Sequence, residues 1–449
     1  MKDKYRDSKF YSLLQLWIGK LGMPIYFRSI EVTGLENIPK NHPVIFTSNH
    51  ENALLDALVV IIAMGTQPYS VARASAFKHP LANKFLTKIR MFPVYRMQDG
   101  KDNMEKNEEL FAKFKDVLLH KKQLLIYPEG DQSMKRRLRP LKKGTFRVAL
   151  DTIASSDYTL DLKIIPVGVN YEDHLRSRTK LLINFGKPVD VLPYKERNEA
   201  DSLKALIALK DEVQEAIRPL MTDIKTTTHF ELADDMRYIV VPEMLLRRGL
   251  SMRSFATNFA VTKEWLTALE KAEIEDQHDM RAFSREYKAY KRMLQKVGLR
   301  DTVFLGGVKG FWSLKLQSVL AFLLLPLFLV GAFVNVIPLW ISNKIRRMIV
   351  KHPNMQATFS FMGGLLFFTI FYFVSFLTLW WSAGILIALV FIFLGPLLGV
   401  FAMEFYLRVK KMNYRWKLYV LKRMYPKIFN ALVDRRQKVL SHAMRLMKI

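Results

Sequence analysis

Three long stretches with almost no charged side chains constrain the fold of this chain more than any other feature. They span residues 316–341, 358–381 and 384–403. Each is close to the length of about 20 residues that a helix needs to cross the hydrocarbon core of a bilayer. Aromatic side chains that favour the membrane interface lie near the ends of the stretches: Trp312, Trp340, Trp380, Trp381 and Tyr406. The sequence therefore predicts an α-helical membrane region over residues 311–405.

The basic loops predict how these stretches are oriented. Lysines and arginines follow the first stretch and the third: Lys344, Arg346, Arg347 and Lys351, then Arg408, Lys410, Lys411, Arg415 and Lys417. The connection at 380–383 has no charge, so the positive-inside rule predicts a hairpin of the second and third stretches with cytoplasmic ends. The polar N-terminus lacks a signal peptide's apolar core, so we expect residues 1–310 on the same side. The first stretch must then enter the membrane from the cytoplasmic side and return to that side. Pro326 and Pro338 permit a broken, re-entrant helix pair there.

Net charge and cysteine content narrow the class of partner. The 449 residues carry a formal net charge of +28 and no cysteine, which excludes disulfides, thiolate nucleophiles and Cys-ligated metals. The segment 406–449, which follows the apolar region, contains 13 Lys/Arg residues and a single acidic residue, Asp434. A basic, aromatic tail beside a membrane span is typical of contact with anionic membrane lipids. Nucleic-acid binding is the rival interpretation, but no recognised nucleic-acid motif accompanies the tail, so we expect no nucleic-acid partner.

The remaining chain reads as an α/β domain with helical additions on both sides. Residues 1–30 suggest an amphipathic interfacial helix, with an ordinary helix packed on the core as the alternative. Residues 231–310 read as a polar helical segment. Over 31–230, strands and helices alternate, which is typical of a mainly parallel sheet flanked by helices. The predicted strands are 43–46, 92–95, 123–127, 163–169 and 180–185, and the predicted helices are 53–64, 81–88, 107–120 and 143–154.

A histidine and an aspartate mark the junction between the first predicted strand and the first predicted helix. His50 and Asp56 lie six positions apart there. A histidine near its natural pKa, oriented by a carboxylate, can remove a proton from a hydroxyl. The alternative is a histidine in a surface turn, with an aspartate in the first turn of the helix. This segment alone does not decide between them.

Further polar residues follow other predicted strands. Arg96 comes after the strand at 92–95, and Glu129 and Gly130 come after the strand at 123–127. Because ligands bind at the carboxyl ends of strands in open α/β sheets, Arg96 could hold a phosphate and Gly130 could let backbone N–H groups approach an oxygen. A basic run comes next: Lys135, Arg136, Arg137, Arg139, Lys142, Lys143 and Arg147. Taken singly, each feature also fits an ion pair, a helix cap or a solvated face.

Together, these motifs resemble those of the glycerol-phosphate and lysophosphatidic acid acyltransferase family. That family carries Asn-His with a downstream Asp, a block that ends in Arg, Phe-Pro-Glu-Gly with a nearby Ser, and a Val/Ile-Pro-Val strand. The matching residues are Asn49 and His50 with Asp56, Arg96, residues 127–130 with Ser133, and Ile165, Pro166 and Val167. The resemblance covers roughly residues 30–190. It departs from the family between His50 and Asp56, where five residues stand in place of the usual four, so Glu51 is the alternative partner.

The resemblance implies acyl transfer from an acyl thioester, acyl-CoA or acyl carrier protein, to a glycerophosphate-type acceptor. Lysophosphatidic acid (1-acylglycerol 3-phosphate) is the first choice, and glycerol 3-phosphate or another lyso-lipid is the alternative. The thioester is a substrate, so no metal or bound cofactor is implied. The expected general base is His50 with Asp56 as its partner, and the expected substrate-binding residues are Asn49, Arg96, Glu129, Gly130, Ser133 and Arg137, with Lys135 as an alternative. A membrane transporter with a basic cytoplasmic domain is the non-enzyme alternative. It is disfavoured because the apolar stretches hold almost no ionisable residues.

Overall fold

The chain forms two compact units, and each unit combines segments that are distant in the sequence. The computed structural model describes residues 5–95, 103–305, 307–350 and 352–448. Unit 1 comprises Met1–Asp223 together with His352–Phe361, and unit 2 comprises Ile224–Lys351 together with Met362–Ile449. A short segment from the C-terminal third of the chain therefore completes the N-terminal unit.

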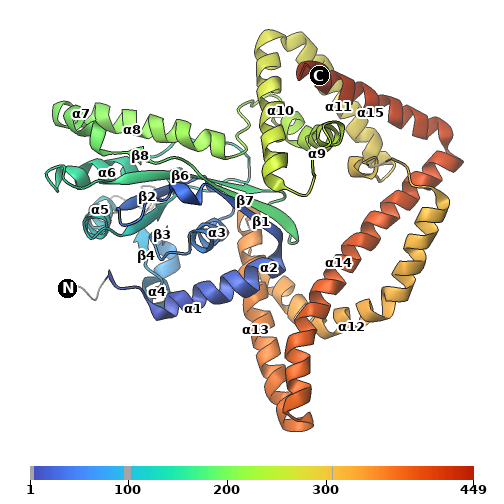
Figure 1. The fold of residues 1–449 in the computed structure, drawn as a ribbon, viewed down its shortest axis with the longest axis horizontal. Helices are drawn as coiled ribbons and strands as arrows, with labels where there is room; N and C mark the ends of the chain where they lie inside the picture. The colour runs from blue at the N-terminus through green and yellow to red at the C-terminus, as the bar shows by residue number, and fades with distance from the viewer. Residues whose placement is uncertain (1–4, 96–102, 306, 351, 449) are drawn as a thin grey trace. The chain divides into compact units, whose positions relative to one another are not determined.

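Unit 1 is built around one eight-stranded sheet in the described part of the chain (Figure 1). Its strands are β1 (Phe27–Thr33), β2 (Val44–Ser48), β3 (Tyr69–Arg73), β4 (Met91–Val94), β5 (Gln123–Ile126), β6 (Lys163–Tyr171), β7 (Thr179–Phe185) and β8 (Val189–Asp190). The order is β1-β7-β6-β2-β5-β3-β4, with β8 beside β6. All neighbours are parallel except that β7 and β8 run antiparallel to β6. The prediction of a mainly parallel sheet is confirmed, and β1, β3 and β8 are additional strands.

Helices alternate with these strands and cover the sheet. They are α3 (Leu54–Met64), α4 (Pro80–Lys88), α5 (Asn103–Leu119), α6 (Gly144–Ala154), α7 (Lys195–Ala200) and α8 (Ser202–Ile217). Because side chains alternate between the faces of a strand, Ile45, Leu124 and Ile164 from the three central strands point to one face. There they pack in one buried core with apolar residues of α5, α6 and α8. The result is the flanked α/β architecture that the sequence predicts.

The central strands bring three chain segments to one edge of the sheet. Strand β2 lies between β5 and β6 and runs parallel to both, with Thr47 opposite Ile126 and Ser48 opposite Val167. The carboxyl ends of these strands therefore lie next to one another. The segments that leave them, 49–53, 127–133 and 172–174, must meet at that edge, which is where an open α/β sheet places its ligands.

The N-terminal residues form a helical entry to unit 1. Helix α1 (Lys9–Leu16) continues through a π-helical turn at Trp17–Gly22 into α2 (Met23–Tyr26). Tyr11 and Ile18 are buried, whereas Leu13 and Leu16 are exposed. One side of the helix therefore packs on the unit, and the exposed apolar side leaves interfacial binding of residues 1–30 as a prediction.

Unit 2 contains a helical core formed by segments from both sides of the apolar region. Its polar helices are α9 (Phe230–Arg247), α10 (Phe255–Glu275), α11 (Gln277–Lys296) and α15 (Pro426–Leu446). Trp265 of α10, Phe283 of α11 and Leu432 of α15 are fully buried in the same cluster. The apolar residues of the predicted basic tail therefore contribute to a protein core, and contact of its charged side with lipid stays a prediction.

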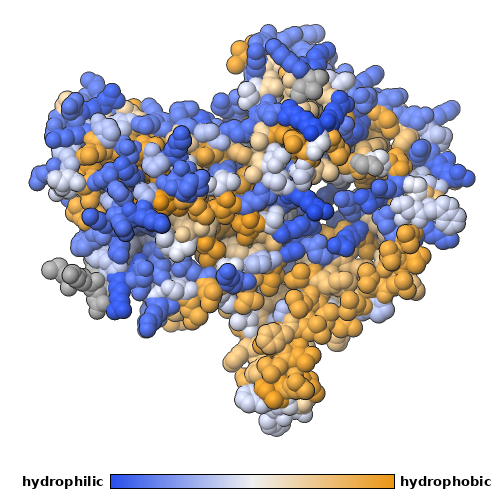
Figure 2. All heavy atoms as spheres, viewed as in Figure 1, coloured by the Kyte–Doolittle hydropathy of each residue, from blue (hydrophilic) through white to orange (hydrophobic). Residues whose placement is uncertain are grey.

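Three helices in unit 2 are long and apolar enough to cross a membrane. They are α12 (Phe311–Ile349), α13 (Gln356–Ala383), whose first residues belong to unit 1, and α14 (Ile385–Met424). Figure 2 shows hydrophobic side chains gathered over them. A broken helix pair was expected at 316–341, but α12 is one continuous, curved helix with Pro326 and Pro338 in its interior (Figure 1). Prolines bend a helix without ending it where neighbouring helices support the backbone.

A polar contact joins the apolar helices at small residues. The Asn335 side chain donates to the carbonyl oxygens of Gly331 (2.8 Å) and Gly395 (3.2 Å), and it accepts from the Tyr372 hydroxyl (2.7 Å). Gly399 lies against the same side chain, where a Cβ atom would come 2.8 Å from it. Hydrogen bonds at closely approaching small residues are a common means of holding helices together in a bilayer.

Candidate active site

The structure brings His50 and Asp56 together at the carboxyl end of β2. His50 Nδ1 lies 2.8 Å from Asp56 Oδ2, and Asp56 stands in the first turn of α3 with a fully buried side chain. His50 itself lies in the turn before the helix, so the turn absorbs the extra residue in the spacing. The carboxylate of Glu51 instead contacts His174 and the side-chain amide of Asn49. Of the two acids that the sequence offered as partners of His50, the structure selects Asp56.

Three further donors hold the Asp56 carboxylate. The backbone N–H groups of Glu51 (2.8 Å) and Asn52 (2.7 Å) donate to Oδ2, and the Tyr171 hydroxyl donates to Oδ1 (2.7 Å). Burial, with Asp56 beside it, raises the pKa of the Tyr171 phenol well above its usual value, which keeps this group a donor. Because a carboxylate accepts hydrogen bonds, the contact with Asp56 assigns the proton of a neutral His50 imidazole to Nδ1, which leaves the lone pair on Nε2.

The His50 ring is fixed on its other side by Tyr127. The two rings stack with centroids 4.3 Å apart at an interplanar angle of 23°. The His50 side chain remains 19% exposed, and no hydrogen bond links its Nε2 atom to any residue in the described ranges. The imidazole is therefore oriented by protein contacts on Nδ1 and on one face, while the nitrogen that would act as a base is accessible.

Glu129 holds the backbone of His50. Its Oε1 accepts the N–H of His50 (3.0 Å), and its Oε2 accepts from Nε of Arg139 (2.8 Å). Burial raises the pKa of Glu129 to about 7, and the Arg139 guanidinium and the His50 amide act in the opposite direction. The carboxylate is thus a buried link between the β5 loop and the histidine, consistent with the expectation that it shapes the site.

The loop after β5 needs its glycine. Gly130 adopts a φ of +70°, and a Cβ atom there would lie 3.2 Å from Cγ of Lys142. Residues other than glycine rarely adopt this backbone conformation. Three residues after Gly130, the N–H of Ser133 donates to the carbonyl oxygen of His50 (3.0 Å). Ser133 therefore contacts the backbone of His50, and substrate binding by Gly130 and Ser133 stays a prediction.

Asn49 is occupied by contacts within the protein. Its Oδ1 accepts the N–H of Val169 (2.8 Å) and its Nδ2 donates to the Val169 carbonyl (3.0 Å), so it joins the end of β2 to β6. The side chain is almost completely buried. A direct contact between Asn49 and substrate stays a prediction, while its positioning contact with β6 is observed.

Members of the basic run after Gly130 bond to different acceptors. Arg136 is buried and donates to the carbonyls of Tyr171 and Glu172, and Arg147 pairs with Glu108 at 2.7 Å. Arg136 and Arg147 therefore bond to acceptors within unit 1, and binding of an acceptor by the basic run stays a prediction. Arg137 is partly buried in the same loop. Arg96 lies outside the described residues, so its role and that of Arg137 in holding a phosphate stay predictions.

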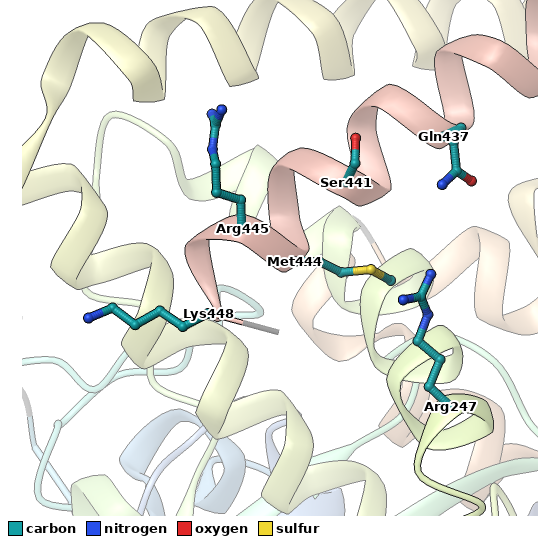
Figure 3. A pocket seen from close by; sticks show the side chains of 6 residues that line it. All are labelled: Arg247, Gln437, Ser441, Met444, Arg445 and Lys448. Carbon is teal, nitrogen blue, oxygen red and sulfur yellow. The ribbon is translucent and has the colours of Figure 1, made fainter.

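Two other features of the described residues do not form a second site. Within the described ranges, no group of three or more His, Asp and Glu side chains is arranged to hold a metal ion. An open pocket in unit 2 is lined by Arg247, Gln437, Ser441, Met444, Arg445 and Lys448. The cationic side chains of this pocket point in different directions (Figure 3), and Arg445 pairs with Asp279 at 2.7 Å. They do not converge on one anion.

Comparison with known proteins identifies a family for the segment that holds this site. The acyltransferase family model matches residues 29–170, a segment that contains His50, Asp56 and the β5 loop. This match of the segment to the acyltransferase family confirms the resemblance drawn from the motifs. Tyr171 falls one residue beyond the match, and residues 352–361 fall far outside it.

The particular relatives are acyltransferases of glycerolipid synthesis. The chain is 27% identical over 153 residues to the 1-acyl-sn-glycerol-3-phosphate acyltransferase BAT2, chloroplastic, of Brassica napus (33% of this chain, 41% of the relative). It is 28% identical over 139 residues to the 1-acyl-sn-glycerol-3-phosphate acyltransferase of Borreliella burgdorferi (31% and 50%). It is also 31% identical over 85 residues to glycerol-3-phosphate O-acyltransferase 2 of Saccharomyces cerevisiae (19% and 11%).

The similarity is confined to part of each protein. The chain spans half the length, or less, of these curated relatives. Among solved structures, the 1-acyl-sn-glycerophosphate (LPA) acyltransferase PlsC of Thermotoga maritima aligns with a TM-score of 0.33 and 17% identity, over 49% of this chain and 85% of that chain.

Proposed function

We propose that this protein transfers an acyl group from an acyl thioester to a hydroxyl of lysophosphatidic acid, in phospholipid synthesis. Two of the relatives described above are named for this acceptor, and the acyltransferase match covers the whole β2 and β5 part of the site. The yeast relative is named for glycerol 3-phosphate, which makes that compound the second candidate acceptor. The proposed donor is acyl-CoA or an acyl carrier protein.

The observation that carries the proposal is the oriented imidazole of His50. With Nδ1 bonded to the buried Asp56 carboxylate, Nε2 can take the proton of the acceptor hydroxyl. The oxygen then attacks the thioester carbonyl, forming a C–O bond, and the tetrahedral intermediate collapses as the C–S bond breaks. The thiolate that leaves takes the proton back from His50, so the base is regenerated. Asp56 stabilises the imidazolium that exists between these steps.

We propose that two arginines recognise the acceptor phosphate. Arg96 and Arg137 are the proposed phosphate ligands because a guanidinium matches a phosphate with two parallel hydrogen bonds. Glu129 and Gly130, in the loop after β5, are proposed to shape the acceptor site. The three apolar helices suit acyl chains and lyso-lipids that reside in a bilayer, and we place the acyltransferase domain on the cytoplasmic face, with the basic residues toward anionic lipids.

The test is an acyl-transfer assay of the full chain in lipid nanodiscs. Labelled acyl-CoA or acyl carrier protein is offered with lysophosphatidic acid, glycerol 3-phosphate or another lyso-lipid. We expect transfer to lysophosphatidic acid and its loss in His50→Ala. His42→Ala is the matched control, because His42 faces Asp161 at 3.3 Å on the surface of the same unit. Undiminished transfer by His50→Ala refutes the mechanism, and no transfer to any glycerolipid acceptor refutes the function.

A further inference from the structure

A segment outside the acyltransferase match packs against the catalytic loops. Residues 352–361, which include the start of α13, belong to unit 1. Ala357 and Phe361 are buried, and the Phe361 ring meets the Tyr26 ring edge-on at 5.2 Å. The side chain of Asn354 donates to the carbonyl of Gln132, the residue before Ser133. The segment is therefore anchored at both ends.

Between these anchors, Thr358 bridges two backbone groups of the turn that follows His50. Its hydroxyl donates to the carbonyl oxygen of Asn52 (2.7 Å) and accepts the N–H of Leu55 (3.1 Å). The Thr358 residue is 7% exposed. One buried hydroxyl thus satisfies both a carbonyl and an amide of the turn that leads from His50 into α3.

This turn needs support because its backbone is strained. Ala53 has a φ of +52° and a ψ of −131°, and the N–H of Leu55 also donates to the carbonyl of Asn52 at 3.1 Å. That is a tight turn whose second position strongly favours glycine. A non-glycine residue persists in such a conformation only when its surroundings hold it there.

Helix α3 also lacks a cap from its own sequence. Ala53 occupies the N-cap position, where Ser, Thr, Asp or Asn usually accepts an N–H of the first turn, and alanine has no group to do so. The N–H of Leu55, which also donates to the Asn52 carbonyl within the turn, finds a side-chain acceptor in Thr358. The missing cap of the helix that carries Asp56 is supplied from a position 303 residues away.

We propose that Thr358 is a positioning residue for the His50–Asp56 pair, a role that rests on the function proposed above. The turn that it holds contributes the N–H of Asn52 to Asp56 and connects directly to His50. Without the hydroxyl, the strained turn relaxes and the carboxylate shifts relative to the imidazole. The site is therefore completed by the first turns of a helix that continues as a candidate membrane span.

The test compares Thr358→Val with Thr358→Ser in the full chain in nanodiscs. Valine keeps the shape and removes the hydroxyl, so we expect kcat to fall roughly 10- to 100-fold, as a misplacement of about 1 Å in a site can do. The KM values for donor and acceptor should change less than about twofold, because Thr358 contacts no side chain that is proposed to bind substrate. The change should therefore affect the transition state and leave ground-state binding of the substrates intact. Serine should restore most of the lost kcat. Thr369→Val is the control, since Thr369 is exposed on the same helix and bonds only its own Leu365 carbonyl.

A second variant tests the strain directly. Glycine adopts the Ala53 conformation without penalty, so Ala53→Gly should raise the kcat of Thr358→Val several-fold. The Tm values of the unaltered protein, the two single variants and the double variant should also be non-additive. This measurement detects the coupling between Ala53 and Thr358 without an activity assay. Equal losses in Thr358→Val and Thr358→Ser, no loss in Thr358→Val, or additive effects of the two substitutions each overturn the proposal. If the unaltered chain transfers no acyl group, the proposed function fails, whereas coupling in Tm still supports the role of Thr358 in holding the turn after His50.

Discussion

Replacing Asp56 by asparagine isolates the charge of the proposed catalytic pair. An asparagine of the same shape can keep its oxygen toward the N–H groups of Glu51 and Asn52, and its amide can donate to the oxygen of Tyr171. The turn and the His50 ring should therefore stay in place. What disappears is the negative charge beside the imidazolium that forms when His50 takes a proton.

The size of the effect follows from the geometry. With Nδ1 and Oδ2 2.8 Å apart, the centres of the two charges lie about 4 Å apart. At an effective dielectric constant of about 20, unit charges at that separation attract by about 4 kcal/mol. If that stabilisation is lost in the transition state, kcat falls about 10³-fold.

The assay is the nanodisc acyl transfer at saturating donor and acceptor, with Tyr171→Phe as the matched control. Tyr171→Phe removes one neutral donor to the same carboxylate but leaves its charge, so a loss of about 1 kcal/mol, roughly fivefold, is expected. The reasoning is refuted if Asp56→Asn stays within tenfold of the unaltered protein, or if Tyr171→Phe falls as far as Asp56→Asn.

Three other predictions concern stability and topology. Because burial raises the pKa of folded Glu129 to about 7, above its usual 4.5, its proton stabilises the fold at low pH and that contribution is lost as pH rises through 7. The Tm of Glu129→Gln should therefore rise relative to the unaltered protein between about pH 5 and about pH 8, and a constant difference would contradict this. Asn335→Leu should lose about 1–2 kcal/mol of stability, seen as a lower Tm in detergent, because the contacts with Gly331, Gly395 and Tyr372 vanish. Since the chain has no cysteine, single cysteines can map the hairpin: Ser382→Cys and Lys410→Cys should react with a membrane-impermeant thiol reagent from opposite sides of sealed vesicles, and labelling from one side would disprove the hairpin.

Much of the site follows from the rule that parallel strands end at one edge of a sheet. That rule placed His50, Glu129 and Gly130 together from the sequence alone, because each follows a strongly apolar run. Tyr171 obeys the same rule and was missed only because the predicted strand at 163–169 stopped two residues before the true end of β6. Strands β1 and β3 were missed because each mixes polar with apolar residues and lacks a continuous apolar run.

Other features depend on contacts that no local pattern reveals. Arg136 and Arg139 belong to a run of like charges that resembles a solvated patch, yet buried acceptors from β6 and the β5 loop take them. Thr358 stands at the start of a stretch whose hydropathy assigns it to the bilayer, and its partners are more than 300 residues away. Hydropathy measures the average environment of a segment, so it cannot identify the single hydroxyl that turns back toward a strained turn.

The contact between Thr358 and Asn52 also sets a schedule for biosynthesis. The two residues are 306 positions apart, and a ribosome that adds about 5–20 residues per second needs roughly 15–60 s to make the chain between them. Once residue 190 has been made, the nascent protein contains all eight described strands and both members of the His50–Asp56 pair, but it still lacks the Thr358 contact with the turn that joins them. On the function and the Thr358 role proposed above, acyl transfer at full rate awaits the emergence of the start of α13.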